Sequence, residues 1–212
     1  MKKIVLLSIM GLLMFGLTGQ AMATAVDLLP ASTVSASLEA IPASTLIASI
    51  TAPFTYTGYA GTVSGTLYQE VRRVETDGTL IFVYKLTNTS TENHYIRVLT
   101  TVNFAGYETE VAYSSNSIVP VLFTRDPSGS VIGFEFADYT AGKYGINSGE
   151  ESATLWIKTD ATSFGLGNSS IINGGSGNVT TFAPKVPEPT SAMLLGLGLV
   201  GFVGKLRRKF TA

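Results

Sequence analysis

Short runs of alternating apolar and polar residues fill the middle of the sequence and limit its fold more than any other feature. In the clearest run, residues 80–87, every second side chain is large and apolar, from Leu80 through Tyr84 to Leu86. This period of two is typical of a β-strand with one face on a core. Comparable runs recur about every ten residues, a spacing typical of sandwiches and barrels. They cover residues 63–74, 95–104, 107–113, 118–124, 130–136, 152–159 and 179–182.

Turn sequences, not helical segments, join these runs. The sequences TDG (76–78) and RDPSG (125–129) each contain a glycine that can adopt the positive φ of a tight turn. Parallel sheets need helical crossovers, whereas antiparallel strands can be joined directly. We therefore predict an all-β fold, an antiparallel β-sandwich with either an Ig-like or a jelly-roll layout.

The chain of 212 residues contains no cysteine. Disulfides, thiolate nucleophiles and cysteine-ligated metals are therefore excluded. Stability has to come from the core alone, and a body of about 160 residues is large enough to bury one.

The first residues have the three parts of a secretory signal. Lys2 and Lys3 are positive, residues 4–17 are apolar, and Ala21 and Ala23 place small side chains where a signal peptidase reads them. We predict a signal peptide over residues 1–23, with a signal helix and cleavage after Ala23.

The last residues predict a short transmembrane helix. The run from Pro189 to Gly204 carries no charge, and a helix of roughly 16 residues rises about 24 Å, slightly less than a hydrocarbon core. A basic cluster follows, as the positive-inside rule expects on the cytoplasmic side. Its members are Lys205, Arg207, Arg208 and Lys209.

This C-terminus resembles a PEP-CTERM sorting signal, with Val186-Pro187-Glu188-Pro189, a glycine-rich apolar run and the basic cluster in that order. The stretches YKLTNTS (84–90) and NFAGYETEVAY (103–113) also resemble the small β-rich proteins of this group. The resemblance implies an exosortase substrate from a Gram-negative bacterium that makes exopolysaccharide. It implies that the membrane helix holds the chain briefly in the inner membrane, with Glu188 as a recognition residue. The tail is then removed near the Pro-Glu-Pro motif, and the body reaches the cell surface or the extracellular space.

Between the signal peptide and the body lies an Ala/Ser/Thr-rich segment, residues 24–53. It contains a near-repeat, LPASTVSAS (29–37) and IPASTLIAS (41–49). Two units are too few for a solenoid, so we expect either a stalk or a pair of edge strands. The predicted organisation is then a signal peptide (1–23), this segment (24–53), a β-sandwich domain (54–185) and the sorting signal (186–212).

The body is acidic once the two ends are set aside. Residues 24–185 contain eight Lys and Arg against fourteen Asp and Glu, a net charge of −6. Phosphate neutralisation needs a basic surface, so nucleic-acid binding is not expected.

Candidates for catalysis or metal binding are few. His94 is the only histidine, so a Ser-His-Asp arrangement would need it; we expect it exposed in a turn. Glu108 and Glu110 share one strand face at about 7 Å, a separation compatible with a solvated face, calcium binding or glycosidase chemistry. Glu150 and Glu151 could also supply calcium ligands. We expect the solvated face, no metal or other cofactor, and no enzymatic activity.

Aromatic residues offer a binding hypothesis. Sugar rings stack on aromatic faces, and the candidates are Tyr56, Tyr59, Tyr139 and Tyr144. Tyrosine is also simply a good strand former. We expect a non-enzymatic surface or matrix protein associated with exopolysaccharide or biofilm. The alternative is a carbohydrate-binding module, which predicts a row of exposed tyrosines on one sheet. A weaker alternative is a glycan-active enzyme with Glu108 and Glu110 in a cleft.

Overall fold

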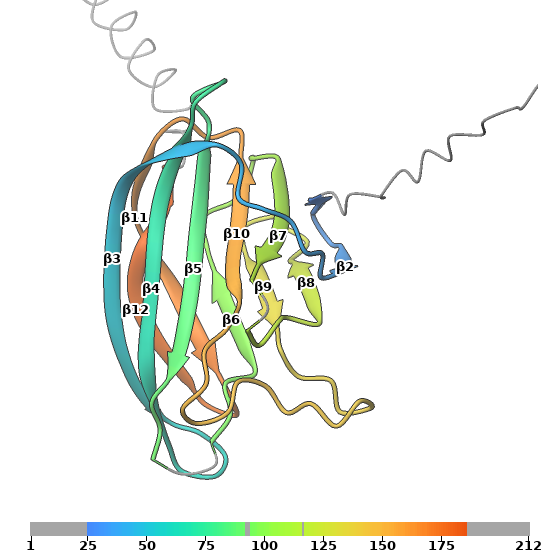
Figure 1. The fold of residues 1–212 in the computed structure, drawn as a ribbon, viewed down its shortest axis with the longest axis vertical. Coiled ribbons are helices and arrows are strands. Elements are labelled where there is room, and N and C mark those ends of the chain that lie inside the picture. The colour runs from blue at the N-terminus through green and yellow to red at the C-terminus, as the bar shows by residue number, and fades with distance from the viewer. Residues whose placement is uncertain (1–24, 92–93, 116, 186–212) are drawn as a thin grey trace, which may run out of the picture.

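The computed structural model describes residues 25–91, 94–115 and 117–185, which form two antiparallel sheets packed face to face (Figure 1). The first sheet has the strand order β1-β7-β10-β5-β4-β3. Its strands, in that order, are β1 (Val26–Asp27), β7 (Thr109–Ser114), β10 (Thr154–Thr159), β5 (Leu80–Asn88), β4 (Thr62–Val74) and β3 (Ser44–Thr57).

The second sheet has the strand order β12-β11-β6-β9-β8-β2. Its strands are β12 (Ser176–Pro184), β11 (Phe164–Ile172), β6 (Val98–Thr101), β9 (Ile132–Glu135), β8 (Leu122–Arg125) and β2 (Thr33–Ser35). All pairings between these strands are antiparallel. The prediction of an all-β antiparallel sandwich is confirmed.

Aromatic side chains from both sheets meet in the core. The ring of Tyr84 on β5 lies 6.0 Å from that of Phe134 on β9, and Phe134 lies 5.5 Å from Phe123 on β8. The hydroxyl groups of Tyr84 and Thr101 are 3.1 Å apart, so a buried hydrogen bond also joins β5 to β6. These contacts fix how the sheets face each other.

Strand β5 is buried on both faces, whereas the alternating pattern predicted one apolar face. Ile81 and Val83 pack with Trp156 in a second apolar cluster on the side of the sheet away from the core. The N-terminal segment covers this cluster, since Ile41 packs on it and the indole Nε1 of Trp156 donates to the Glu39 carbonyl at 3.2 Å. The residues before β3 are therefore part of the packed body.

The two near-repeats form edge strands, one in each sheet. The first contains β2, the last strand of the second sheet, and the second contains the start of β3, the last strand of the first sheet. Strand β3 continues to Thr57 without a break at residue 53.

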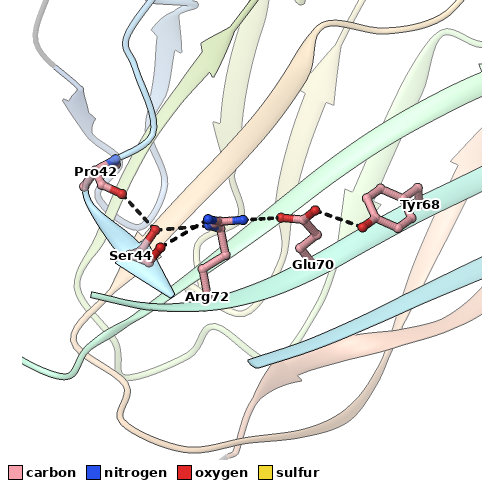
Figure 2. Close-up of polar contacts among 5 residues, drawn as sticks. All are labelled: Pro42, Ser44, Tyr68, Glu70 and Arg72. Atoms are coloured by element: carbon pink, nitrogen blue, oxygen red, sulfur yellow. Dashed lines mark hydrogen bonds and ion pairs between the residues drawn. The ribbon is translucent and has the colours of Figure 1, made fainter. Parts of the chain in front are cut away.

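Figure 2 shows how the start of β3 is fixed to β4. Ser44 donates to the Pro42 carbonyl at 2.8 Å, and Arg72 donates to the Ser44 hydroxyl and carbonyl, both at 3.1 Å. Glu70 pairs with Arg72 at 2.8 Å and accepts a bond from the Tyr68 hydroxyl at 2.8 Å. This network spans the register shift between Leu46 and Ala48, where the edge pairing is irregular.

The predicted terminal helices, the signal helix and the transmembrane helix, lie outside the described residues. Among the residues that are described, we find no helix with the length and apolar character needed to cross a bilayer.

The sandwich has two distinct ends. At one end the chain reaches Lys185, whose N–H donates to the Ser163 carbonyl at 3.0 Å and whose carbonyl accepts the Tyr107 hydroxyl at 2.5 Å. We call this the exit end. At the other end, the loop end, the turn between β3 and β4 meets the turn between β11 and β12, where Tyr59 N–H donates to the Asn173 carbonyl at 3.3 Å (Figure 1). Strand β12 has nine residues, so the two ends are about 30 Å apart.

Candidate functional site

Four tyrosines and one arginine form a continuous cluster at the loop end. The ring of Tyr144 lies 5.4 Å from that of Tyr95 and 6.1 Å from that of Tyr139. The guanidinium carbon of Arg97 lies 5.2 Å from the Tyr139 ring centre and 5.6 Å from that of Tyr59. We call Tyr59, Tyr95, Arg97, Tyr139 and Tyr144 the tyrosine cluster.

Three of these rings are accessible to a ligand. Tyr59 is 77% exposed, Tyr139 57% and Tyr144 50%. Exposed aromatic faces of this kind are where sugar rings and other amphipathic ligands bind. Sequence reasoning named these three residues, and the fold brings them together from segments more than 70 residues apart.

The loop that carries Tyr139 and Tyr144 is held by its own hydrogen bonds. The backbones of Asp138 and Lys143 exchange two bonds of 2.8 Å. The Asp138 carboxylate accepts the Thr140 hydroxyl at 2.6 Å and two backbone N–H groups, and the Thr140 hydroxyl is the main reason why the pKa of Asp138 is lowered. The loop after β9, drawn in gold in Figure 1, therefore contains a turn that its own hydrogen bonds stabilise.

Close backbone approaches fix the other members of the tyrosine cluster. A Cβ added to Gly145 would lie 2.2 Å from the Ile96 carbonyl oxygen, so the chain beside Tyr144 must be glycine to lie this close to the chain beside Tyr95. Gly174, at φ 73°, leaves room for the Tyr59 ring, since a Cβ there would lie 2.1 Å from it. These two glycines therefore make room for the close packing at the tyrosine cluster.

A pocket of about 350 Å³ adjoins the tyrosine cluster. Tyr95, Lys143 and Tyr144 line it together with Ile118 and Phe136. Its volume lies near the lower limit of small-molecule sites. A ligand stacked on Tyr144 could therefore extend into it.

Tyr56, the fourth tyrosine named from the sequence, is a core residue. It is 9% exposed and packs beside Phe54 with ring centres 6.3 Å apart. Burial raises its pKa to about 12. It lies on the inward face of β3, so it offers no face to a ligand. The exposed tyrosines at this end also come from loops, not from a row along one sheet as the carbohydrate-binding hypothesis predicted.

Glu108 and Glu110 line a second pocket, of about 220 Å³, at the exit end. Glu110 faces Lys158 at 3.7 Å, and the Glu108 N–H donates to the Asp160 carboxylate at 2.9 Å. Asp77 lines the same pocket, and hydrogen bonds from Thr79 lower its pKa.

The remaining candidates have structural partners. His94 is buried (5% exposed), not exposed as expected, because its carbonyl accepts the Asn88 amide at 2.7 Å and its ring lies against Gly61. Glu150 accepts two bonds from Asn147. Glu151 pairs with Lys85, whose hydrogen bond lowers the pKa of Glu151.

Across the described ranges, no three His, Cys, Asp or Glu side chains are grouped in a way that could hold a metal ion. The predicted sorting and processing residues lie outside the described residues: Ala21, Ala23, Val186, Pro187, Glu188, Pro189, Lys205, Arg207, Arg208 and Lys209.

Comparison with known proteins finds a match at the C-terminal end of the sequence. Residues 185–209 match the family model of the PEP-CTERM protein-sorting motif. The motif marks an exosortase substrate, and it implies export, processing by exosortase and association with the cell surface. No curated protein and no solved structure matches the chain.

Proposed function

We propose that this exosortase substrate is a non-enzymatic protein of the cell surface or extracellular matrix that associates with exopolysaccharide. The sorting motif supports export to the cell surface. The observation that carries the association is the tyrosine cluster, which has three exposed rings at one end of the sandwich, one of which, Tyr144, lines a pocket.

The more specific form of this proposal is a carbohydrate-binding module. Tyr139 and Tyr144 supply accessible ring faces, and stacking of this kind contributes on the order of 1 kcal/mol per ring. Several sugars bound in succession would then reach a useful affinity. Neither the stacking of one sugar nor the binding of several in succession requires a catalytic group.

Binding to the matrix polysaccharide of the exporting organism tests the proposal. The body, residues 24–185, would be titrated with the purified polysaccharide in a co-sedimentation assay. We expect saturable binding that falls at least about tenfold in Tyr139→Ala/Tyr144→Ala, since a factor of ten corresponds to about 1.4 kcal/mol.

The matched control is Tyr68→Ala, which removes a tyrosine that is 36% exposed on β4 outside the tyrosine cluster. This variant should bind like the unchanged body. Equal losses in both variants, or no binding by the unchanged body, would count against a glycan site at the loop end.

A further inference from the structure

Arg97 gives the tyrosine cluster a positive charge that no described carboxylate neutralises. The ion pairs formed by the described residues involve Arg72, Lys85 and Lys158, all outside the cluster. The carboxylate in the same loop, Asp138, is occupied by Thr140 and two backbone N–H groups.

One donor of this guanidinium is also left without an acceptor. The Nε atom of Arg97 is buried and has no hydrogen-bond partner among the described residues. A buried donor without a partner costs on the order of 1–3 kcal/mol. Because this nitrogen is shielded from solvent, a ligand has to pair with the terminal nitrogens of the guanidinium.

The position of Arg97 is fixed by its backbone. Its N–H donates to the Ile172 carbonyl at 3.1 Å, and its carbonyl accepts the Phe136 N–H at 2.8 Å. The side chain then lies near the rings of Tyr59 and Tyr139. A guanidinium held by aromatic contacts keeps its planar N–H groups available, and their fork matches a carboxylate.

Resting on the proposed glycan association, we infer that the tyrosine cluster selects an acidic saccharide, one whose sugar carries a carboxylate. The carboxylate pairs with Arg97, and the ring of the same sugar stacks on Tyr139. The next sugar lies over Tyr144, at the mouth of the pocket where Lys143 adds a second positive charge. The ligand is thus an acidic oligosaccharide, recognised by charge and ring together.

The test compares one oligosaccharide in two forms. Glucuronic acid oligomers and their carboxyl-reduced counterparts would be titrated into the full body by isothermal titration calorimetry. The two differ only at C6, where a hydroxymethyl group replaces the carboxylate. We expect the acidic form to bind at least about tenfold more tightly at low salt, with the difference shrinking as salt is raised.

Arg97→Gln should abolish this preference while leaving affinity for the reduced form within about twofold. Tyr144→Ala should weaken both forms. Lys158→Gln removes the same charge at the exit end and should change neither affinity. The thermal transition of each variant verifies folding, and the comparison on the unchanged body remains decisive if Arg97→Gln does not fold.

The outcomes separate the two proposals. Equal affinity of the unchanged body for both forms would overturn the selection of acidic sugars and leave glycan association standing. Absence of binding to either form, while the native matrix polysaccharide still binds, would also overturn the acidic-sugar inference. If the native polysaccharide fails to bind as well, the proposed function fails with it.

Discussion

At the scale of single residues, Arg125 illustrates how a buried charge can be held by hydrogen bonds to backbone carbonyls. It is 5% exposed, and its guanidinium donates to carbonyls of Leu28, Phe104, Tyr107 and Gly129 at 2.8–2.9 Å. A further bond of 2.9 Å reaches the Thr109 hydroxyl. One side chain therefore joins the N-terminal segment, the turn before β7 and the turn between β8 and β9.

Replacing this guanidinium should destabilise the whole domain. We expect Arg125→Met to lower the free energy of unfolding by about 2–4 kcal/mol, because several buried carbonyls lose their donor together. Arg125→Lys keeps the charge but cannot reach all the acceptors, so its loss should be intermediate. Urea denaturation measures both values, and a loss below about 0.5 kcal/mol in Arg125→Met would contradict this role.

The buried tyrosines predict alkaline sensitivity. The ordinary tyrosine pKa is 10.0, and burial raises that of Tyr56 to about 12. Between these values the unfolded chain has released the proton and the folded chain has not, so the unfolded state binds fewer protons and stability falls as pH rises. Tyr56→Phe should reduce this loss, and it removes a buried hydroxyl without a described partner. Urea denaturation at pH 8 and about pH 11 measures this loss of stability in the parent and in Tyr56→Phe. The control is Tyr59→Phe, which changes an exposed tyrosine.

Sequence patterns predict only some members of the tyrosine cluster. Tyr59, Tyr139 and Tyr144 could be named because loop tyrosines are few. Tyr95 and Arg97 were not named, since they lie in an alternating run that reads as an ordinary strand. The signal that could have singled out Arg97 is its rarity, as the described body has only four arginines.

At the scale of strands, Gln69 protects the open edge of the second sheet. Its side chain is fully buried on β4 and forms a reciprocal pair with Phe182 on β12, accepting its N–H at 2.5 Å and donating to its carbonyl at 2.7 Å. The amide thus replaces one residue of a neighbouring strand. An unprotected edge is a site for pairing with other chains.

Gln69→Leu should expose this edge and leave two buried backbone groups without partners. We expect a loss of about 2 kcal/mol in unfolding free energy and faster amide exchange at Phe182. Gln69→Glu should lower the free energy of unfolding further at neutral pH, because a charge is buried. In acid its difference from the parent should shrink, because a protonated carboxyl group can again donate and accept. Unchanged exchange at Phe182 in Gln69→Leu would rule out the edge-protecting role.

The strands that sequence reasoning located include those with regular alternation, such as β5 and β7. Strand β11 was missed because FGLGNSSII combines two glycines with polar residues, and it gains its strand structure from pairing with β12 and β6. The long edge strand β3 was divided at residue 53, because its first half has an exposed, Ser/Thr-rich sequence. Pairing with β4 determines that half, and no local pattern records the pairing.

At the scale of the whole molecule, the folded body ends directly before the sorting motif. Lys185 is bonded to both Ser163 and Tyr107, and Pro187 follows two residues later. The sorting motif therefore follows in the sequence a residue that hydrogen bonds fix at the exit end.

The body should accordingly survive loss of its tail. We expect residues 24–185 to show a β-type circular dichroism spectrum and a cooperative thermal transition. Ending the chain at Ser176 removes nearly all of β12, exposes the edge of β11, and should give aggregated or unfolded protein on size-exclusion chromatography. A folded, monomeric product of the shorter chain would contradict the view that β12 completes the sandwich.

The separation of the two ends has a consequence for many copies acting together. In a layer of bodies tethered near Lys185, each loop end would lie about 30 Å along the sandwich from its tether. The proposed glycan sites at the loop ends would then bind one long polysaccharide chain multivalently, with many weak contacts acting together. The affinity measured on one detached body would then be lower than the avidity of the whole layer for the polysaccharide.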